Sequence, residues 1–300
     1  MQRHPGCRYN VRMTLPLNAG QIAERSFAIG QGVRVEVIDS IPSTNTELRA
    51  RIPGLSGPML LVAEVQTAGR GRAGRHWHSA PGDSLCFSLA WPFRGPIARL
   101  SGLSLAVGVA IAETLRVLGW PVQLKWPNDL LLDGGKLGGV LIETAHQSGE
   151  SSPVLWAVIG VGLNVRTNPA RDSLPGVAAA ALLPAAQTGH DTGTVDDAMN
   201  RNHLLAALTD GLSAALTEFD HDGLSLFTGR WQSLHAHQGQ PVCIVEQDEV
   251  LQQGIARGID ETGRLLLDTA RGRMAITAGD VSLRPVHDPV AQGGVHAALD

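Results

Sequence analysis

The spacing of apolar residues switches along this chain between the period of a strand and the period of a helix. Leu85, Phe87, Leu89 and Trp91 alternate over 84–91, whereas apolar residues recur at every third or fourth position over 101–118 and 204–219. This switching is typical of an α/β or α+β domain whose mixed sheet is flanked by helices. The other strands of the sheet are expected over 33–39, 60–66, 122–126, 137–144 and 154–165.

After Gly239 the pattern changes to short apolar runs separated by turns for about fifty residues, which predicts a small β-barrel. We therefore divide the chain into four parts. They are an N-terminal extension with a short helix near 19–27, an α/β domain, the barrel and a tail, over 1–32, 33–236, 237–288 and 289–300.

The composition predicts a protein with a sizeable core and no membrane span. Hydrophobic residues make up 43% and charged residues 17% of the chain, and a net charge of −4 argues against a nucleic-acid backbone as the main partner. The apolar stretches fall short of the ~20 residues that a membrane helix needs. The first residues lack the apolar run of a secretory signal, and three widely spaced cysteines indicate a reducing compartment, so we expect a cytoplasmic protein.

A loop rich in glycine and arginine follows the expected strand over 60–66. Its residues 69–74 match G-x-G-x-x-G, but the following segment runs into a strand rather than a helix, which argues against a dinucleotide fold. Arg70, Arg72 and Arg75 lie close together there, and guanidinium groups among glycines bind phosphate or carboxylate well. The alternative is a flexible basic surface loop.

Two other local patterns are weaker than they first look. His76 and His78 form an H-x-H pair without a third metal ligand, so surface or packing roles are favoured. Lys136 follows two glycines, but Leu137 stands where a phosphate-binding P-loop needs Ser or Thr.

Four segments, taken together and in this order, resemble the biotin–protein ligases. They are Ser43-Thr44-Asn45, AEVQTAGRGRAGRHW over 63–77, KWPNDLLLDGGKLGGVLIE over 125–143 and IGVGLN over 159–164. The resemblance covers roughly residues 33–286. It implies a catalytic biotin- and ATP-binding domain over 33–236, related in fold to class II aminoacyl-tRNA synthetases and lipoate ligases. It also implies an SH3-like form for the C-terminal barrel.

The resemblance further implies a two-step ligase reaction. Biotin's carboxylate attacks the α-phosphate of ATP to give biotinyl-5′-AMP and pyrophosphate, with Mg²⁺ as the metal. A lysine of a biotin carboxyl carrier protein or carboxylase domain then attacks the mixed anhydride, and AMP leaves. The implied form is the ligase without an N-terminal DNA-binding domain, acting as a monomer or homodimer.

Motif matching assigns residues to each part of this reaction. Arg72 and Lys136 would supply the catalytic positive charge, and Asp129 would either help hold Mg²⁺ or form a structural ion pair or cap. Trp126 is either a core tryptophan or part of the site. Biotin would contact Ser43, Thr44, Asn45, Gln66, Arg70, Gly71, Arg72, Lys136 and Gly138, and the nucleotide would contact Arg72, Trp77, Asn128, Lys136 and Asn164.

Several alternatives stay open at this point. Ser43 is also a good helix N-cap, and both roles fit one turn. The rival functions are a lipoate or octanoate ligase and a non-catalytic biotin-binding regulator. A DNA-binding repressor is disfavoured because residues 1–32 lack two consecutive amphipathic helices. The acceptor lysine must lose a proton, and either Asp129 or solvent takes it. Translation starts at Met1 or Met13.

Overall fold

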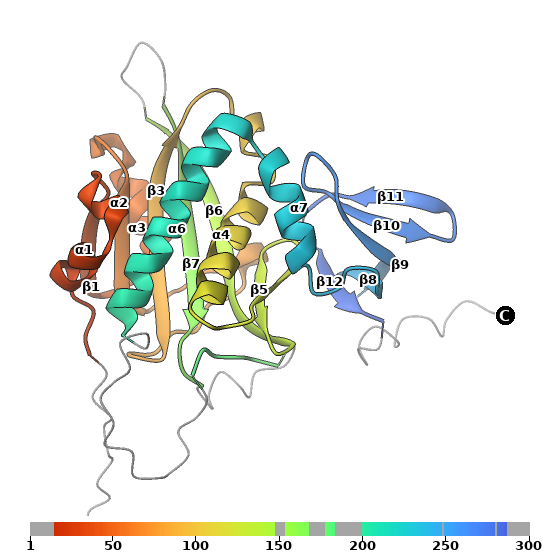
Figure 1. Ribbon diagram of the computed structural model, residues 1–300, viewed down its shortest axis with the longest axis horizontal. Helices are drawn as coiled ribbons and strands as arrows, with labels where there is room; N and C mark the ends of the chain where they lie inside the picture. The colour runs from red at the N-terminus through yellow and green to blue at the C-terminus, as the bar shows by residue number, and fades with distance from the viewer. Residues whose placement is uncertain are drawn as a thin grey trace, which may run out of the picture.

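The computed structural model describes residues 15–147, 154–167, 178–183, 200–247, 249–279 and 281–286. A seven-stranded mixed sheet forms its centre, in the order β1-β2-β3-β7-β6-β5-β4 (Figure 1). β1 and β2 are parallel, and every other neighbouring pair is antiparallel. The strands are β1 (Arg34–Ile41), β2 (Met59–Gln66), β3 (Ser84–Phe93), β4 (Gln123–Lys125), β5 (Asp129–Leu132), β6 (Gly135–Gln147) and β7 (Val154–Asn164).

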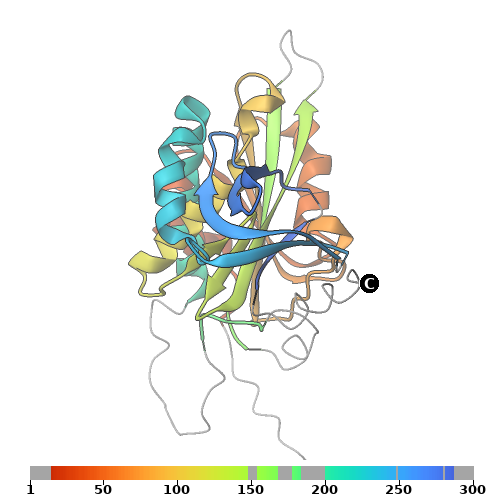
Figure 2. The ribbon, with the colours of Figure 1, turned by 90° about the vertical axis from the view of Figure 1, so that its right-hand side faces the viewer.

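Helices cover both faces of this sheet, as Figure 2 shows with the sheet between them. α4 and α6 pack together on one face with α7, and α1 and α2 lie against α6. α3 lies on the other face, against β2, β3, β6 and β7. The helices are α1 (Ala19–Arg25), α2 (Phe27–Gly30), α3 (Thr44–Arg51), α4 (Leu103–Val117), α6 (Arg201–Asp222) and α7 (Ser225–Leu234), with 3₁₀ turns at Ile52–Gly54, Arg72–Gly74 and Ile97–Leu100.

The two faces of the sheet are packed very differently. The larger core lies between the sheet and α4, α6 and α7, and a smaller apolar cluster lies under α3. Along β7, Ile159 and Leu163 point into the larger core, while Trp156 and Val158 pack under α3. Gly160 and Gly162 follow on the α3 face, so that face loses its bulky side chains beyond Val158.

α4 is the core helix of the molecule. With the preceding turn it forms the stretch Ile97–Val117, which within the described residues is long and apolar enough to cross a membrane. This stretch is longer than the sequence spacing indicated. More than half of it is buried, against the sheet and against α6 and α7, as in the core helix of a globular domain.

A five-stranded antiparallel sheet, in the order β11-β10-β9-β8-β12, follows α7 (Figure 1). Leu265, Leu267 and Leu283 belong to the same buried cluster as the core beneath α4. Trp126, fully buried, donates a hydrogen bond from Nε1 to the carbonyl of Gly263 at 3.0 Å. The strands are β8 (Pro241–Glu246), β9 (Glu249–Ile259), β10 (Leu265–Thr269), β11 (Gly272–Ile276) and β12 (Ser282–Pro285).

The mixed sheet, its flanking helices and the run of C-terminal strands agree with the sequence expectation. Two elements were missed: β5, whose residues were read only as part of a motif, and α7, which follows α6 after Gly223. Residues 168–197 are rich in Pro, Gly and Ala, which predicts a long surface segment, and most of them lie outside the described residues. Trp126 is both a core tryptophan and part of the cavity wall described below.

We expect Phe219→Ala to lower the free energy of unfolding by about 3–5 kcal/mol, because it removes a ring from the larger core. Phe219 is 2% exposed and packs edge-on against Phe93, with ring centroids 6.3 Å apart. Val117→Ala is the control, because Val117 is 87% exposed and should change stability by no more than roughly 0.5 kcal/mol. Denaturant unfolding measures both, and equal effects would contradict the assignment of this core.

Candidate active site

A cavity of about 500 Å³ opens on the α3 face of the sheet, beside the N-terminus of α3. Its floor is the part of β6 and β7 where Gly139, Gly160 and Gly162 replace bulky side chains. The 70–78 loop, the β4–β5 turn and the segment before β12 form its walls. The sequence candidates that line it are Ser43, Thr44, Asn45, Gln66, Arg70, Gly71, Arg72, Trp77, Asn128, Asp129, Lys136 and Asn164.

A polar turn closes one end of the cavity. Ser43 caps α3, its Oγ accepting from the Thr46 amide, so the capping role is present. The Thr44 amide and hydroxyl both donate to Gln66 Oε1, at 2.8 and 3.1 Å. Ser88, fully buried on β3, has its Oγ 2.6 Å from Asn45 Oδ1. These bonds hold the turn in one arrangement before any ligand binds.

Two of the floor glycines are required by their neighbours. A Cβ on Gly160 would lie 2.3 Å from Asn45 Oδ1, and a Cβ on Gly162 would lie 2.4 Å from the Trp77 ring. Any side chain there would displace Asn45 or Trp77. Gly138 is not among the residues lining the cavity; a Cβ there would meet the Gly162 carbonyl and Leu163 inside the larger core. Its neighbour Gly139 faces the cavity instead.

The glycine- and arginine-rich loop is a tight hairpin. The Gly71 amide donates to the Arg75 carbonyl at 2.7 Å, and the Trp77 amide donates to the Gly69 carbonyl at 2.9 Å. The loop leads into β3, with no helix whose N-terminus could hold a pyrophosphate, so it is not a dinucleotide-binding turn. A Cβ on Gly69 would lie 2.5 Å from the Trp77 carbonyl, which explains the glycine.

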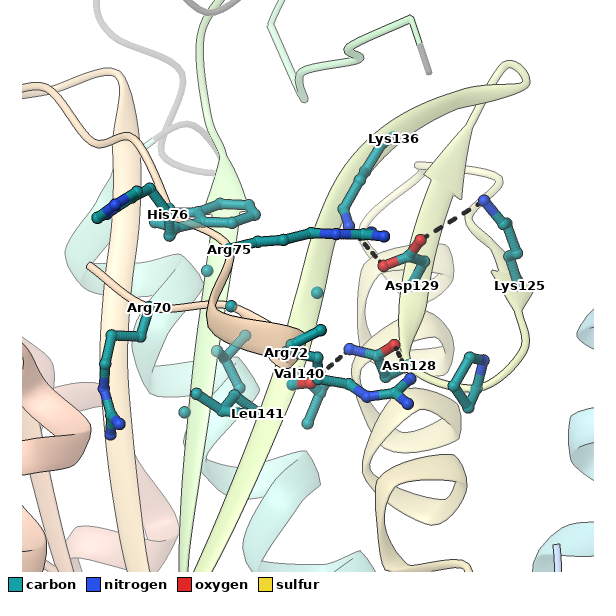
Figure 3. A pocket seen from close by; sticks show the side chains of 18 of the residues that line it. Arg70, Arg72, Arg75, His76, Lys125, Asn128, Asp129, Lys136, Val140 and Leu141 are labelled. Carbon is teal, nitrogen blue, oxygen red and sulfur yellow. Dashed lines mark hydrogen bonds and ion pairs between the residues drawn. The ribbon is translucent and has the colours of Figure 1, made fainter. Parts of the chain in front are cut away.

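The arginines of this loop separate into two directions (Figure 3). Arg72 donates to Asn128 Oδ1 at 3.0 Å and to the Gly279 carbonyl, and Arg75 reaches Ser282 Oγ at 3.5 Å. Arg70 points the other way and pairs with Glu143 at 2.5 Å. The sequence grouped these arginines together, whereas the structure places Arg70 at the polar turn.

Asp129 lies between the two lysines of the whole sequence, Lys125 and Lys136. Lys136 Nζ is 2.6 Å from Asp129 Oδ1, and Lys125 Nζ is 3.7 Å from Oδ2 (Figure 3). Burial lowers the pKa of Lys125 below the ordinary value for a lysine, against the opposing effect of Asp129. Both carboxylate oxygens of Asp129 are therefore occupied by ammonium groups.

Amide side chains fix the backbone around these charges. Asn128 Nδ2 donates to the Val140 carbonyl at 2.7 Å, and Asn164 Nδ2 donates to the carbonyls of Lys136 and Ala180. Asn128 therefore has its Oδ1 turned toward Arg72 and its Nδ2 toward β6. This arrangement ties the loop, the β4–β5 turn and β6 together on one side of the cavity.

The cavity carries a large excess of positive charge. Its lining includes six lysine and arginine side chains and, among the described residues, a single carboxylate, Asp129. Nowhere in the described part of the chain do three or more His, Cys, Asp or Glu side chains group as metal ligands. Such a cavity suits a ligand with several negative charges. The six are Arg70, Arg72, Arg75, Lys125, Lys136 and Arg284.

Sequence reasoning missed four residues of this site. Ser88 is a polar residue in the otherwise apolar middle of β3, and Glu143 was quoted only as the last residue of a motif. Lys125 was quoted only as part of a motif. Arg284 lies on β12 and joins the cavity through tertiary packing that no local pattern predicts.

Comparison with known proteins gives two family matches. Residues 37–164 match the biotin/lipoate A/B protein ligase family, and residues 237–284 match the biotin protein ligase C terminal domain. The first match spans the polar turn, the arginine-rich loop, both lysines and the glycine floor. The second spans the C-terminal sheet.

Individual relatives are similar over most of the chain. The chain is 37% identical to the bifunctional ligase/repressor BirA of Escherichia coli (strain K12), over 93% of this chain and 82% of that protein. It is 32% identical to the biotin--[acetyl-CoA-carboxylase] ligase of Mycobacterium tuberculosis, over 90% of this chain and 97% of the relative. The biotin protein ligase from Aquifex aeolicus, solved in complex with biotin and ATP, matches 84% of this chain and 99% of its own with a TM-score of 0.63 and 28% identity.

We expect Ser88→Ala to lower the free energy of unfolding by roughly 1–3 kcal/mol, because Asn45 Oδ1 loses a buried hydrogen-bond donor. Ser233→Ala is the control: Ser233 is exposed, and its hydroxyl donates only to the Arg230 carbonyl within α7. Denaturant unfolding measures both variants. If Ser88→Ala were as neutral as the control, the polar turn would not depend on this hydroxyl.

Proposed function

This chain belongs to the biotin protein ligase family, and from that premise we propose how its cavity performs the family's reaction. It is an ATP-dependent ligase that forms biotinyl-5′-AMP and transfers the biotinyl group to a lysine of a biotin carrier protein. The observation that carries this proposal is one cavity with a polar turn at one end and an excess of fixed cations at the other.

The first step brings together two anions, a carboxylate and a triphosphate. Arg72 and Lys136 are placed to offset their repulsion, because both line the cavity on its cationic side. Hydrogen bonds already orient them, Arg72 to Asn128 and Lys136 to Asp129, so little reorganisation is needed when charge develops. We assign the catalytic roles to these two residues.

We propose that biotin's ureido ring binds at the polar turn. The ring is neutral and polar, so it needs fixed donors and acceptors in an enclosed slot. Ser43, Thr44, Asn45 and Gln66 supply these groups, and Arg70 and Gly71 border the same end. A lipoate or octanoate chain has no such polar head, and an intact cationic site argues against a non-catalytic regulator.

The nucleotide would occupy the side formed by Trp77, Asn128 and Asn164. Because Asp129 is the single described carboxylate in the cavity and is paired with two lysines, these residues do not form a resident metal centre. We propose that Mg²⁺ enters as part of the MgATP substrate, held mainly by the phosphates.

The second step needs a base for the acceptor lysine, whose ordinary pKa near 10.4 keeps it protonated at neutral pH. Asp129 is the carboxylate within the cavity, but Lys125 and Lys136 occupy its oxygens. Phosphate binding by these lysines would free Asp129 to accept the proton. We prefer this assignment to proton transfer to bulk solvent.

We propose the domain limits 33–236 for the catalytic part and 237–288 for the C-terminal part, with an SH3-like barrel in the latter. The chain would work in the cytoplasm on a carboxylase's carrier domain. In the described residues before β1, α1 has seven residues and α2 has four.

Biotin-dependent ATP–pyrophosphate exchange tests this function directly. We expect exchange with biotin and none with lipoate or octanoate, and Lys136→Ala should reduce it at least about a hundredfold, because it removes a fixed charge from the transition state. Arg94→Ala is the control, since that side chain is 84% exposed and outside the cavity. Exchange with lipoate alone would mean that the polar turn binds a different acid and that the protein is a lipoate ligase. No exchange with any acid would favour a non-catalytic binding protein.

Replacing Arg72 should affect retention of the intermediate more than ATP binding. Arg72 joins the loop to Asn128 and to the Gly279 carbonyl, so Arg72→Ala should loosen the wall that keeps water from the anhydride. We expect biotinyl-5′-AMP to appear in solution, with the KM for ATP within about threefold of wild type. Chromatography of the free adenylate measures this, and a tightly retained adenylate with a large rise in KM would contradict it.

A further inference from the structure

Glu143 joins three parts of the biotin side of the site, although it does not itself line the cavity. It lies on β6, and its side chain is 17% exposed. Oε2 accepts from Asn45 Nδ2 at 3.0 Å and from Arg70 at 2.5 Å, and Oε1 accepts from Arg49 at 3.0 Å. One carboxylate therefore connects the polar turn, α3 and the arginine-rich loop to the floor.

The contact with Asn45 fixes which way its amide points. Nδ2 donates one hydrogen to Glu143 and is 3.2 Å from the Leu141 carbonyl, while Oδ1 faces the Ser88 hydroxyl. An ionised carboxylate can only accept, so it excludes the flipped amide. Gly160 lies directly against Asn45: a Cβ there would stand 2.3 Å from Oδ1, so this position of the amide requires glycine.

The contact with Arg70 fixes the part of the 70–78 loop that carries this residue. Figure 3 shows the Arg70 side chain directed away from Arg72, Lys136 and Asp129. Its guanidinium is engaged by Glu143 rather than aimed at the cationic side of the cavity. The part of the loop that carries Arg70 is therefore held beside the polar turn.

Glu143 is ionised under ordinary conditions. Burial raises its pKa, but the hydrogen bonds from Arg70 and Asn45 and the charge of Arg49 outweigh that effect and leave the pKa below the ordinary value for a glutamate. The carboxylate therefore remains an acceptor throughout the neutral range.

We propose that Glu143 is a positioning residue for biotin. It holds the Asn45 amide and the part of the loop that carries Arg70 together, and in this way it shapes the slot that binds the ureido ring. This inference rests on the proposed function, since it concerns the biotin side of the same reaction. It assigns Glu143 no contact with ATP. Replacing Glu143 should therefore weaken the binding of biotin and leave the binding of ATP largely unchanged.

The test is the KM for biotin and for ATP in pyrophosphate exchange, measured for wild type, Glu143→Gln and Glu143→Asp. Glutamine keeps the shape but removes the charge, so the three charge-assisted hydrogen bonds weaken and the KM for biotin should rise about tenfold or more, with the KM for ATP within about twofold. Aspartate keeps the charge but is one methylene shorter, so it should recover part of the loss. Glu113→Gln, which breaks an arginine pair between α4 and α7 outside the cavity, should change neither constant.

The outcomes separate the two proposals. Wild-type protein without biotin-dependent exchange would overturn the proposed function and this inference with it. An active wild type with an unchanged KM for biotin in Glu143→Gln, or with equal rises in both constants, would overturn the inference alone. Arg70→Gln breaks the same ion pair from the other partner. Because the Arg70 side chain is exposed, its replacement should leave the sheet folded. We expect this variant to raise the KM for biotin and to leave the KM for ATP unchanged. An unchanged KM for biotin in that variant would overturn the role given to the pair.

Discussion

Alternation of side chains across β6 and β7 is the constraint on which the site depends. Because successive residues of a strand face opposite sides, the strands that fill the core beneath α4 also build the cavity floor. Ile159 and Leu163 of β7 are buried in the core, while Gly160 and Gly162 between them lie against Asn45 and Trp77. A shift in register by one residue would put glycines in the core and leucines in the cavity, so the core packing fixes the site geometry.

Concentrated positive charge is the second constraint, and it explains the hydrogen bonds around the cavity. Two unit charges 4 Å apart repel by about 4 kcal/mol at the effective dielectric typical of a protein surface. Asp129 offsets the repulsion between Lys125 and Lys136 by pairing with both. Asn128 orients Arg72 through a hydrogen bond. Glu143 pairs with Arg70 and directs it away from the other cations. These contacts offset the repulsion among the cations with few carboxylates. A polyanionic ligand would supply the missing negative charge, and its binding would stabilise the fold.

Local patterns predicted most of the fold because they depend on period and on turn residues. The helix of α4 and the alternation in β3 are visible in the sequence, and Ser43 is both a predicted and an observed cap. The assignment of individual site residues was less complete for a physical reason. The direction of the Arg70 side chain depends on Glu143, which is seventy-three residues away. The face of the sheet on which Gly138 lies depends on a bulge in the pairing of β5 and β6. Such contacts exist only once the strands have paired.

The C-terminal sheet is part of the same structural unit as the cavity. Leu283 and Leu265 are buried in the core that α4 covers, and the Trp126 side chain reaches Gly263 from the start of the β4–β5 turn. Since Asn128 and Asp129 follow directly in that turn, the packing of Trp126 also sets where they stand. Arg72 and Arg75 make their outer contacts with Gly279 and Ser282, and Arg284 completes the wall. Removing this sheet would therefore disturb folding, the β4–β5 turn and the loop together, so single substitutions at the wall report on catalysis more cleanly than truncation.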